Sequence, residues 1–348
     1  MAKKSKKAKM ARKSKPTKKA KNAKKVVKAA KPAKKTGKLI VLAVGGNSLI
    51  VDEKHKTVQD QYQAVVQTCN DIAKVIQRGH RVVITHGNGP QVGFILRRSE
   101  LAAQELHHVP LDSCDADTQG AIGYQIQKAM FNVTRVWPKR PDVTTVVTQV
   151  LVDRDDPSFK NPSKPIGSFM QESMAREHQA KDGWVVVEDA GRGWRRVVPS
   201  PKPMKIMELE SIKTLLDAGT IVVAVGGGGI PVVEDEQGML RGAEAVIDKD
   251  HASSLLARDL KADFLIISTA VPQVSINFKK PDEKKLDRIT LVEAKQYLAE
   301  GHFAPGSMQP KIEAVIAFLE GGGKEAIITD PAHLDLAIEG KAGTRIVA

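Results

Sequence analysis

The sequence predicts an α/β fold whose sheet is mostly parallel. Short runs that are apolar throughout, at residues 39–44 and 264–268, indicate strands that are buried on both faces. A long amphipathic stretch at residues 57–77 separates the first run from a second strand at 81–85, which is the order of a βαβ unit. Since ligands bind beyond the carboxyl ends of the strands in such sheets, the glycine-rich loops that follow several strands are expected to face one cleft.

Elements further along the chain continue this alternation. Residues 153–205 differ, because six prolines interrupt them. Residues 184–187 could pair with 195–198 as a β-hairpin, so we expect a small subdomain that protrudes over the cleft. The other expected elements are a helix at 91–106 and strands at 144–152, 221–225 and 326–329.

The net charge of +14 is concentrated in residues 1–38, which hold 18 Lys and Arg and no Asp or Glu. Subtracting these from 54 basic residues leaves 36 against 40 acidic residues, so the remainder carries −4. A segment of Lys, Ala, Ser and Pro buries too little apolar surface to fold alone, so we expect a disordered tail before one domain at residues 39–348. The tail would suit nonspecific binding to nucleic acid or another polyanion, although it lacks aromatic side chains for base stacking. A solubilising extension is the alternative.

Composition argues against several classes of protein. The two cysteines, Cys69 and Cys114, form no CxxC or Cys/His spacing, and the histidines show no metal spacing, so we predict no metal site built from protein ligands. No apolar run approaches the ~20 residues of a membrane helix. The first residues lack the apolar stretch of a signal peptide, so a cytoplasmic protein without membrane association is expected.

Three predicted strands end in glycine-rich loops, at Gly45-Gly46-Asn47, Gly87-Asn88-Gly89 and Gly226 to Gly229. Glycine lets the backbone approach a ligand and turn its N–H groups towards an anion. Pro90, after the second loop, suits the first turn of a helix. Four consecutive glycines cost ~0.5–1 kcal/mol each relative to alanine, which favours close approach to a nucleotide over a plain linker. Tight strand-to-helix turns are the alternative for the first two loops.

A charged motif, Asp248-Lys249-Asp250, precedes an expected helix at residues 251–260. Asp250 is a suitable N-cap for that helix. The motif is consistent with a lysine held between two carboxylates and directed at phosphates. The alternative is a capped helix with a solvated lysine.

Two further lysines occur in stiffened segments. Lys164 lies in a proline-containing loop at residues 159–167, and Lys311 opens a helix after residues 305–310. A solvated basic loop and an ordinary helix entry are the respective alternatives.

In this order, these motifs resemble those of the carbamate kinases of the amino acid kinase superfamily. The match extends from about residue 38 to residue 347. The long matching segments are highly specific for the family, whereas each short glycine loop alone is not. They cover residues 77–93, 118–124, 188–195 and 301–308.

The resemblance implies a three-layer αβα sandwich around a mainly parallel eight-stranded sheet, with a protruding subdomain and a homodimeric assembly. It implies ATP and ADP with Mg²⁺, and carbamate or carbamoyl phosphate, as ligands, and a role in arginine metabolism. Carbamate is already an anion, so its oxygen needs no general base. The site must instead offset the repulsion between carbamate and the triphosphate.

The resemblance also assigns roles to residues. Lys249 and Lys311 match phosphate-contacting lysines, Asp248 matches the carboxylate that holds them, and Lys164 matches a subdomain lysine that reaches into the cleft. Residues matching the family's substrate loops are Gly45, Gly46, Asn47, Gly87, Asn88 and Gly89, and those on the nucleotide side are Gly226, Gly227, Gly228, Gly229 and Met308.

The sequence departs from the family at Pro272, where an acidic residue is common, and at Lys279, where glycine is common. Two other functions fit the residues. One is a nucleic-acid-associated protein built on a kinase body, suggested by the basic tail. The other is a kinase of the same superfamily that acts on a different carboxylate.

Overall fold

The computed structural model describes residues 37–45, 55, 57–189 and 191–348. Residues 1–36 of the predicted tail lie outside the described residues, as do Gly46 and Asn47 of the first glycine loop. The described residues belong to one unit, Thr36–Ala348. Among them, no helix combines the length and the apolar character that a membrane span requires.

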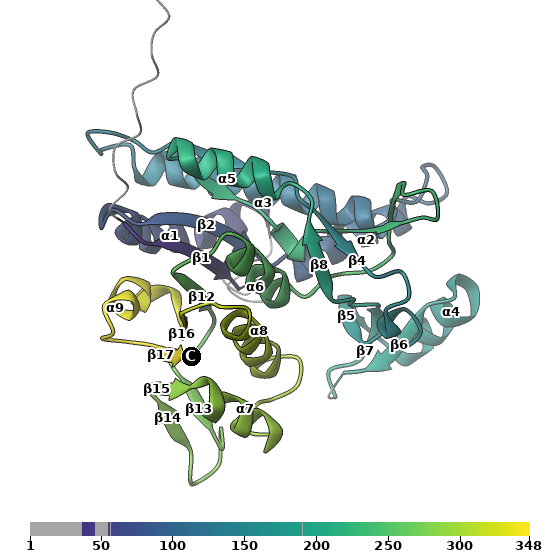
Figure 1. The fold of residues 1–348 in the computed structure, drawn as a ribbon. Coiled ribbons are helices and arrows are strands. Elements are labelled where there is room, and N and C mark those ends of the chain that lie inside the picture. Colours follow the sequence, from purple (N-terminus) through teal and green to yellow (C-terminus); the bar gives the residue numbers. More distant parts are fainter. Residues whose placement is uncertain (1–36, 46–54, 56, 190) are drawn as a thin grey trace, which may run out of the picture. The chain divides into compact units, whose positions relative to one another are not determined.

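An eight-stranded sheet forms the central layer (Figure 1). Every pair of neighbouring strands is parallel except one, the pair β16–β17, so the prediction of a mainly parallel sheet is confirmed. The strand order is β15 (Arg288–Thr290), β17 (Thr344–Val347), β16 (Glu325–Thr329), β12 (Phe264–Ser268), β1 (Leu39–Val44), β2 (Arg81–His86), β9 (Ile221–Val223) and β3 (Val143–Thr145).

Two layers of helices cover this sheet, because alternate side chains of each strand point to opposite faces. In β1, Val41 and Ala43 belong to one core cluster, whereas Ile40 and Leu42 belong to the other. This is the three-layer αβα arrangement that the resemblance implied. The helices on the first face are α5 (Leu209–Ala218), α6 (Lys249–Asp259), α7 (Leu291–Ala299) and α8 (Met308–Glu320), and those on the second are α1 (Val58–Gln77), α3 (Leu111–Val133) and α9 (Leu334–Ile338).

The helix predicted at residues 57–77 is confirmed, and its sequence explains both ends. Thr57 Oγ1 accepts a hydrogen bond from Asp60 N at 3.2 Å, and Asp60 Oδ2 accepts one from Thr57 N at 3.0 Å. This reciprocal capping box satisfies two backbone donors that the helix would otherwise leave free. Gly79, with φ of +84°, follows the last turn and directs the chain into β2.

The prediction of a single strand at residues 144–152 is wrong. The chain forms β3 in the main sheet and then β4 (Gln149–Val152) in a second sheet. Between them, Thr148 N donates to Gln119 Oε1 at 2.7 Å, and Thr148 Oγ1 accepts from Val225 N at 3.0 Å. The second sheet has the order β11 (Leu240–Gly242), β10 (Ile230–Glu234), β4 and β8 (Pro203–Ile206).

A third sheet lies within the predicted subdomain, with the antiparallel order β5 (Lys164–Met170), β7 (Trp194–Val198) and β6 (Val185–Glu188). The predicted hairpin is confirmed, since Val185 pairs with Val197 and Glu188 with Trp194. Helix α4 (Glu172–Asp182) accompanies these strands, which stand apart from the eight-stranded sheet (Figure 1).

Helix α2 (Gly89–Leu101) begins and ends earlier than the predicted 91–106, with Pro90 in its first turn. It packs against β5 so closely that a Cβ built on Gly93 would lie 2.5 Å from Gly167 Cα. Helix α2 therefore joins the second glycine loop to the subdomain. The remaining elements are β13 (Val274–Ile276), β14 (Lys284–Leu286) and 3-10 turns at Pro157–Phe159, Gly226–Gly228 and Pro331–His333.

Candidate active site

The carboxyl ends of five neighbouring strands open into one cleft of about 750 Å³, a size suited to a small-molecule site. This confirms the expected convergence of the glycine loops. Its lining includes nine of the predicted residues: Gly45, Gly87, Asn88, Gly89, Lys164, Gly227, Asp248, Lys249 and Lys311.

Four predicted nucleotide-side residues do not line this cleft. Gly226, Gly228 and Gly229 are buried behind Gly227, and Met308 packs against the core beneath α8.

Local sequence places the charged motif at the start of α6. Asp248 is the N-cap, and its Oδ1 accepts hydrogen bonds from Asp250 N at 2.9 Å and His251 N at 3.4 Å. The prediction that Asp250 is the N-cap and that the helix starts at residue 251 is therefore wrong. Because the helix begins at Lys249, both Lys249 and Asp250 are fixed by its first turn.

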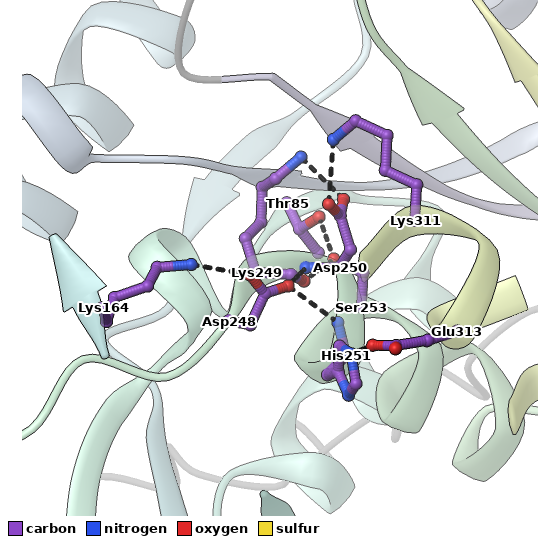
Figure 2. Close-up of polar contacts among 9 residues, drawn as sticks. All are labelled: Thr85, Lys164, Asp248, Lys249, Asp250, His251, Ser253, Lys311 and Glu313. Atoms are coloured by element: carbon purple, nitrogen blue, oxygen red, sulfur yellow. Dashed lines mark hydrogen bonds and ion pairs between the residues drawn. The ribbon is translucent and has the colours of Figure 1, made fainter. Parts of the chain in front are cut away.

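Asp250 holds the two lysines together (Figure 2). Its carboxylate oxygens lie 2.9 Å from Lys249 Nζ and 2.9 Å from Lys311 Nζ. The resemblance assigned this role to Asp248, whereas in the structure Asp250 contacts both lysines. Asp248 commits one oxygen to the helix cap, and its other oxygen pairs with Lys164 Nζ at 2.6 Å.

Burial and charge shape the titration of this cluster. Burial alone would raise the pKa of the Asp250 carboxyl, but Lys249 and Lys311 outweigh burial and hold that pKa well below its usual value. Burial lowers the pKa of Lys249, although the attraction of Asp250 counters it. With Asp250 ionised, two ammonium groups face one carboxylate, so the cluster has a surplus positive charge that an anion can neutralise.

Lys249 has unfilled hydrogen-bonding capacity. Its side chain is 11% exposed, and its ion pair with Asp250 lacks the geometry of a hydrogen bond. Within the described ranges, Lys249 Nζ has no hydrogen-bond acceptor. A buried ammonium group costs free energy unless its donors are satisfied, so this nitrogen is suited to an oxygen of a bound anion.

The first turn of α6 is tied to the sheet beneath it. Ser253 Oγ donates to Lys249 O at 2.7 Å and lies 2.7 Å from Thr85 Oγ1 on β2 (Figure 2). His251 Nε2 lies 3.5 Å from Glu313 Oε2 on α8, the helix that carries Lys311. These contacts fix the separation of the two lysines.

Asn88 belongs to a buried polar network that the sequence did not reveal. Its Nδ2 donates to Asp115 Oδ1 and to Thr118 Oγ1, each at 2.9 Å. Burial raises the pKa of Asp115 well above its ordinary value, only partly countered by the hydrogen bond from Asn88. Asp115 therefore orients Asn88 from below the cleft.

Asp115→Asn is expected to change the pH dependence of stability. A carboxyl whose pKa is raised by folding makes the folded state progressively less stable as pH rises above its unfolded pKa of about 3.9. Asparagine cannot ionise, so the melting temperature of the variant minus that of the parent should increase between pH 4 and pH 8. Asp117→Asn on the same helix is the control. A difference that stays constant over this range would contradict a raised pKa for Asp115.

The turn at Gly226–Gly228 contains backbone that only glycine adopts without strain. Gly227 has φ of +70°, and a Cβ on it would lie 2.3 Å from Asn88 Nδ2. A Cβ on Gly226 would lie 2.4 Å from His86 Nε2. The close approach that the glycines permit is thus to neighbouring protein atoms. Strand β9 ends at Val223 rather than at residue 225, and Val225 already has left-handed backbone angles, with φ of +54°.

Gly227→Ala is expected to lower kcat/KM by at least about tenfold, since displacing Asn88 by an ångström disturbs the pocket. Gly238→Ala is the matched control, because Gly238 has φ of +75° with open space around its Cβ position. Both variants incur left-handed strain of about 1–2 kcal/mol, measurable by thermal unfolding. Equal kinetics in the two variants would show that close approach at residue 227 is unimportant.

Arg195 lines the cleft but was not predicted from the sequence, although it lies in the segment 188–195 that contributes to the family resemblance. Its Nη2 donates to Gly167 O at 3.2 Å, and its Nη1 lies 3.3 Å from Asp189 Oδ2. It brings a second subdomain cation to the lining, beside Lys164. The pattern of β7 alone does not indicate this position, because Trp194, Arg195 and Arg196 are all half-buried.

Among the described residues, no group of three His, Cys, Asp or Glu side chains could hold a metal ion. The carboxylates nearest the lysines, Asp248 and Asp250, are already ion-paired. Mg²⁺ often keeps several waters and binds through phosphates and few carboxylates. The residues therefore fit a Mg²⁺ ion carried by a nucleotide rather than one held by the protein alone.

Comparisons with known proteins match this architecture. The profile of the amino acid kinase family matches residues 38–330. The chain is 48% identical over 314 residues to the carbamate kinase of Thermococcus kodakarensis, covering 89% of this chain and 99% of that protein. It is equally similar, over the same length and with the same coverage, to the carbamate kinase-like protein YahI of Escherichia coli.

A solved structure is also similar. It is the carbamate kinase of Giardia lamblia bound to AMP-PNP, with a TM-score of 0.84 and 43% identity. The alignment covers 90% of this chain and 99% of that chain. The fold, the subdomain and the lysine cluster therefore occur in a chain that aligns with these proteins over nearly their full length.

Proposed function

This chain belongs to the amino acid kinase family, and carbamate kinases are among its relatives at about 48% identity, so we propose the following reaction for the cleft. The protein is a carbamate kinase: it transfers a phosphoryl group reversibly between ATP and carbamate, giving ADP and carbamoyl phosphate. The structural observation that supports this proposal is the convergence of Lys249 and Lys311 on Asp250, in a cleft that is also lined by glycine-rich turns.

In the forward direction, a carbamate oxygen forms a bond to the γ-phosphorus of ATP as the bond between that phosphorus and the β–γ bridging oxygen breaks. The electron pair of the broken bond leaves with ADP. Carbamate needs no deprotonation, so no general base is required. The protein must position two anions and offset their repulsion.

Each cation has a distinct proposed role in this step. Lys249 and Lys311 contact the transferred phosphoryl group, and Asp250 keeps them at fixed positions. Lys164 reaches the cleft from the subdomain, where Asp248 pairs with it. Gly45, Gly87, Asn88 and Gly89 line the part of the cleft proposed for carbamate, and Gly227 lines the part proposed for the nucleotide.

ATP and ADP are the nucleotide substrates, and a Mg²⁺ ion bound with the nucleotide would neutralise part of the phosphate charge. Asp248 and Asp250 both line the cleft, and both are paired with lysines. The lysines therefore supply the protein's own share of charge neutralisation.

The test is ATP formation from carbamoyl phosphate and ADP, measured in a coupled assay on the full-length protein. Acetyl phosphate and acyl phosphates of acidic amino acids are assayed beside carbamoyl phosphate. We expect carbamoyl phosphate to give the highest kcat/KM. If another acyl phosphate gave a higher kcat/KM, the corresponding carboxylate would be the acceptor instead of carbamate. This comparison matters because one relative is named only as a carbamate kinase-like protein.

We also propose a homodimer. Helix α3 presents Tyr124 and Phe131 on one stripe, 60% and 57% exposed, with Leu101 of α2 70% exposed. Exposed aromatic side chains of this kind mark association surfaces when they are contiguous. Sedimentation of Tyr124→Lys should give a monomer where the parent gives a dimer. A parent that sediments as a monomer would refute the proposal.

The basic segment at residues 1–38 adds a second proposed activity in a cytoplasmic enzyme, the nonspecific binding of polyanions. Its 18 positive charges predict steep salt dependence. DNA binding is measured between low and physiological salt on full-length protein and on a variant lacking residues 1–38. Full-length protein that ignores DNA at low salt would exclude this activity.

A further inference from the structure

A second cavity of about 210 Å³ lies between α2 and the subdomain, apart from the cluster of lysines. Its apolar walls come from Leu96 on α2, Phe169 and Met170 on β5, Met174 on α4, and Trp184. An apolar cavity of about 150 Å³ admits benzene, so this one is large enough for a ring with a short substituent. Nothing in the reaction described above uses it.

Arg196 occupies a position in this cavity where the sheet pattern calls for an apolar side chain. It pairs across the sheet with Ile166 on β5 and with Val186 on β6, and such partners share a face. Ile166, Val186 and Val198 on that face are 2%, 8% and 3% exposed. A guanidinium among them costs free energy unless a partner neutralises it.

No carboxylate among the described residues forms an ion pair with Arg196. Its guanidinium lies 4.8 Å from the centre of the Trp184 ring, which stacks on His178 at 4.1 Å. The nearby acidic groups have other partners. Glu100 lines the cavity and pairs there with Arg97 at 3.2 Å. Asp182 pairs with His178 at 2.6 Å, and Glu244 accepts from Leu111 N at 3.0 Å.

Burial lowers the pKa of Arg196, and Glu244, Glu100 and Asp182 counter this only in part. The guanidinium remains charged, because arginine is not deprotonated in proteins. The cavity thus combines the Arg196 cation, the Trp184 ring that stacks on His178, and several apolar side chains, with the Arg97–Glu100 ion pair also in its lining. These features match a small molecule with one carboxylate and a compact apolar body.

We propose that this cavity is a second ligand site, which binds a small monocarboxylate with an aromatic or branched apolar body through Arg196. A planar carboxylate can accept two N–H donors from the guanidinium. The apolar body would lie against Trp184 and Leu96. The ligand would also contact β5, the strand whose first residue is Lys164.

Phenylacetate is a suitable probe, with phenylacetamide as its uncharged match. Binding to the full-length protein is measured by titration calorimetry. We expect saturable binding of phenylacetate, at least about tenfold weaker binding of the amide, and a similar loss in Arg196→Gln, because a charge-assisted contact is removed. Arg241→Gln is the control, since Arg241 is 64% exposed and lies outside the cavity lining.

Two more variants separate this site from the cleft and from misfolding. Leu96→Trp fills the cavity without altering charge, so it should abolish phenylacetate binding even if Arg196→Gln does not fold. Lys311→Ala disables the cleft and should leave phenylacetate binding unchanged. The proposal is overturned by absent or unsaturable binding, by equal binding of the amide, by full binding in Leu96→Trp, or by loss of binding in Lys311→Ala.

Discussion

Lys249→Ala and Lys311→Ala are each expected to lower kcat/KM for ATP formation from carbamoyl phosphate and ADP by about 10²–10³. This is the loss that follows removal of one preorganised contact to charge in a transition state. Both ammonium groups lie 2.9 Å from the Asp250 carboxylate. A neighbouring cation therefore cannot easily take the place of either one. The coupled assay measures the loss directly.

Folding should survive either substitution, because Asp250 retains one lysine partner when the other is removed. Lys280→Ala is the control, since Lys280 is an exposed lysine away from the cleft. Melting temperatures close to that of the parent establish that the variants are folded. Undiminished turnover in either cleft variant would remove that lysine from the proposed mechanism.

Asp250→Asn is expected to lower the free energy of unfolding by about 3–5 kcal/mol, because it leaves two buried ammonium groups without a carboxylate. Asp250 is 6% exposed on its side chain, so water cannot take over its role. Activity should fall as well, since mutual repulsion would move the lysines apart. Chemical denaturation at pH 7 measures the first effect, and the coupled assay measures the second.

The pH dependence of this loss has a predictable sign. Burial already lowers the pKa of Lys249, and removal of Asp250 takes away the attraction that counters burial. A lysine with a depressed pKa in the folded state makes folding more favourable as pH rises towards its unfolded pKa. The deficit of Asp250→Asn should therefore shrink between pH 7 and pH 10.

Asp248→Asn is the matched control, one helical position from the buried cluster. Asparagine is as good an N-cap as aspartate, and the partner Lys164 is 33% exposed. The expected loss of stability is smaller than that of Asp250→Asn, because only one lysine, which is partly exposed, loses its carboxylate. If the two substitutions cost the same, the bridging role of Asp250 would be wrong.

The sequence predicted the strands and the glycine loops because their signals are local. A run such as Leu39–Val44 is apolar at every position, which in an α/β chain indicates a strand with helices on both faces. Identification of Lys249 and Lys311 as cleft residues came from the resemblance, since a single lysine before a helix has no specific signature.

The division of labour between Asp248 and Asp250 was not predictable in this way. Both are good capping residues, and they are two positions apart, so composition does not decide which one starts the helix. Backbone angles at Asp248 decide it, with φ of −69° and ψ of 124°. Once Asp248 is the cap, only Asp250 can face both lysines.

Long-range contacts account for the other errors. The break between β3 and β4 depends on Gln119, which is distant in sequence and occupies the N–H of Thr148. The orientation of Asn88 depends on Asp115 in the same way. Neither partner is indicated by local periodicity, because a buried polar residue in a helix resembles an exposed one until the packing is known.

Helix α2 and strand β5 pack glycine against glycine, and this close packing determines how far Lys164 reaches into the cleft. At Gly93 and Gly167 the two backbones touch, with no methyl group between them. Any substitution at residue 93 would act as a spacer and shift the strand outward, carrying Lys164 with it. The placement of a cation in the cleft is thus governed by a position that lies outside the cleft lining.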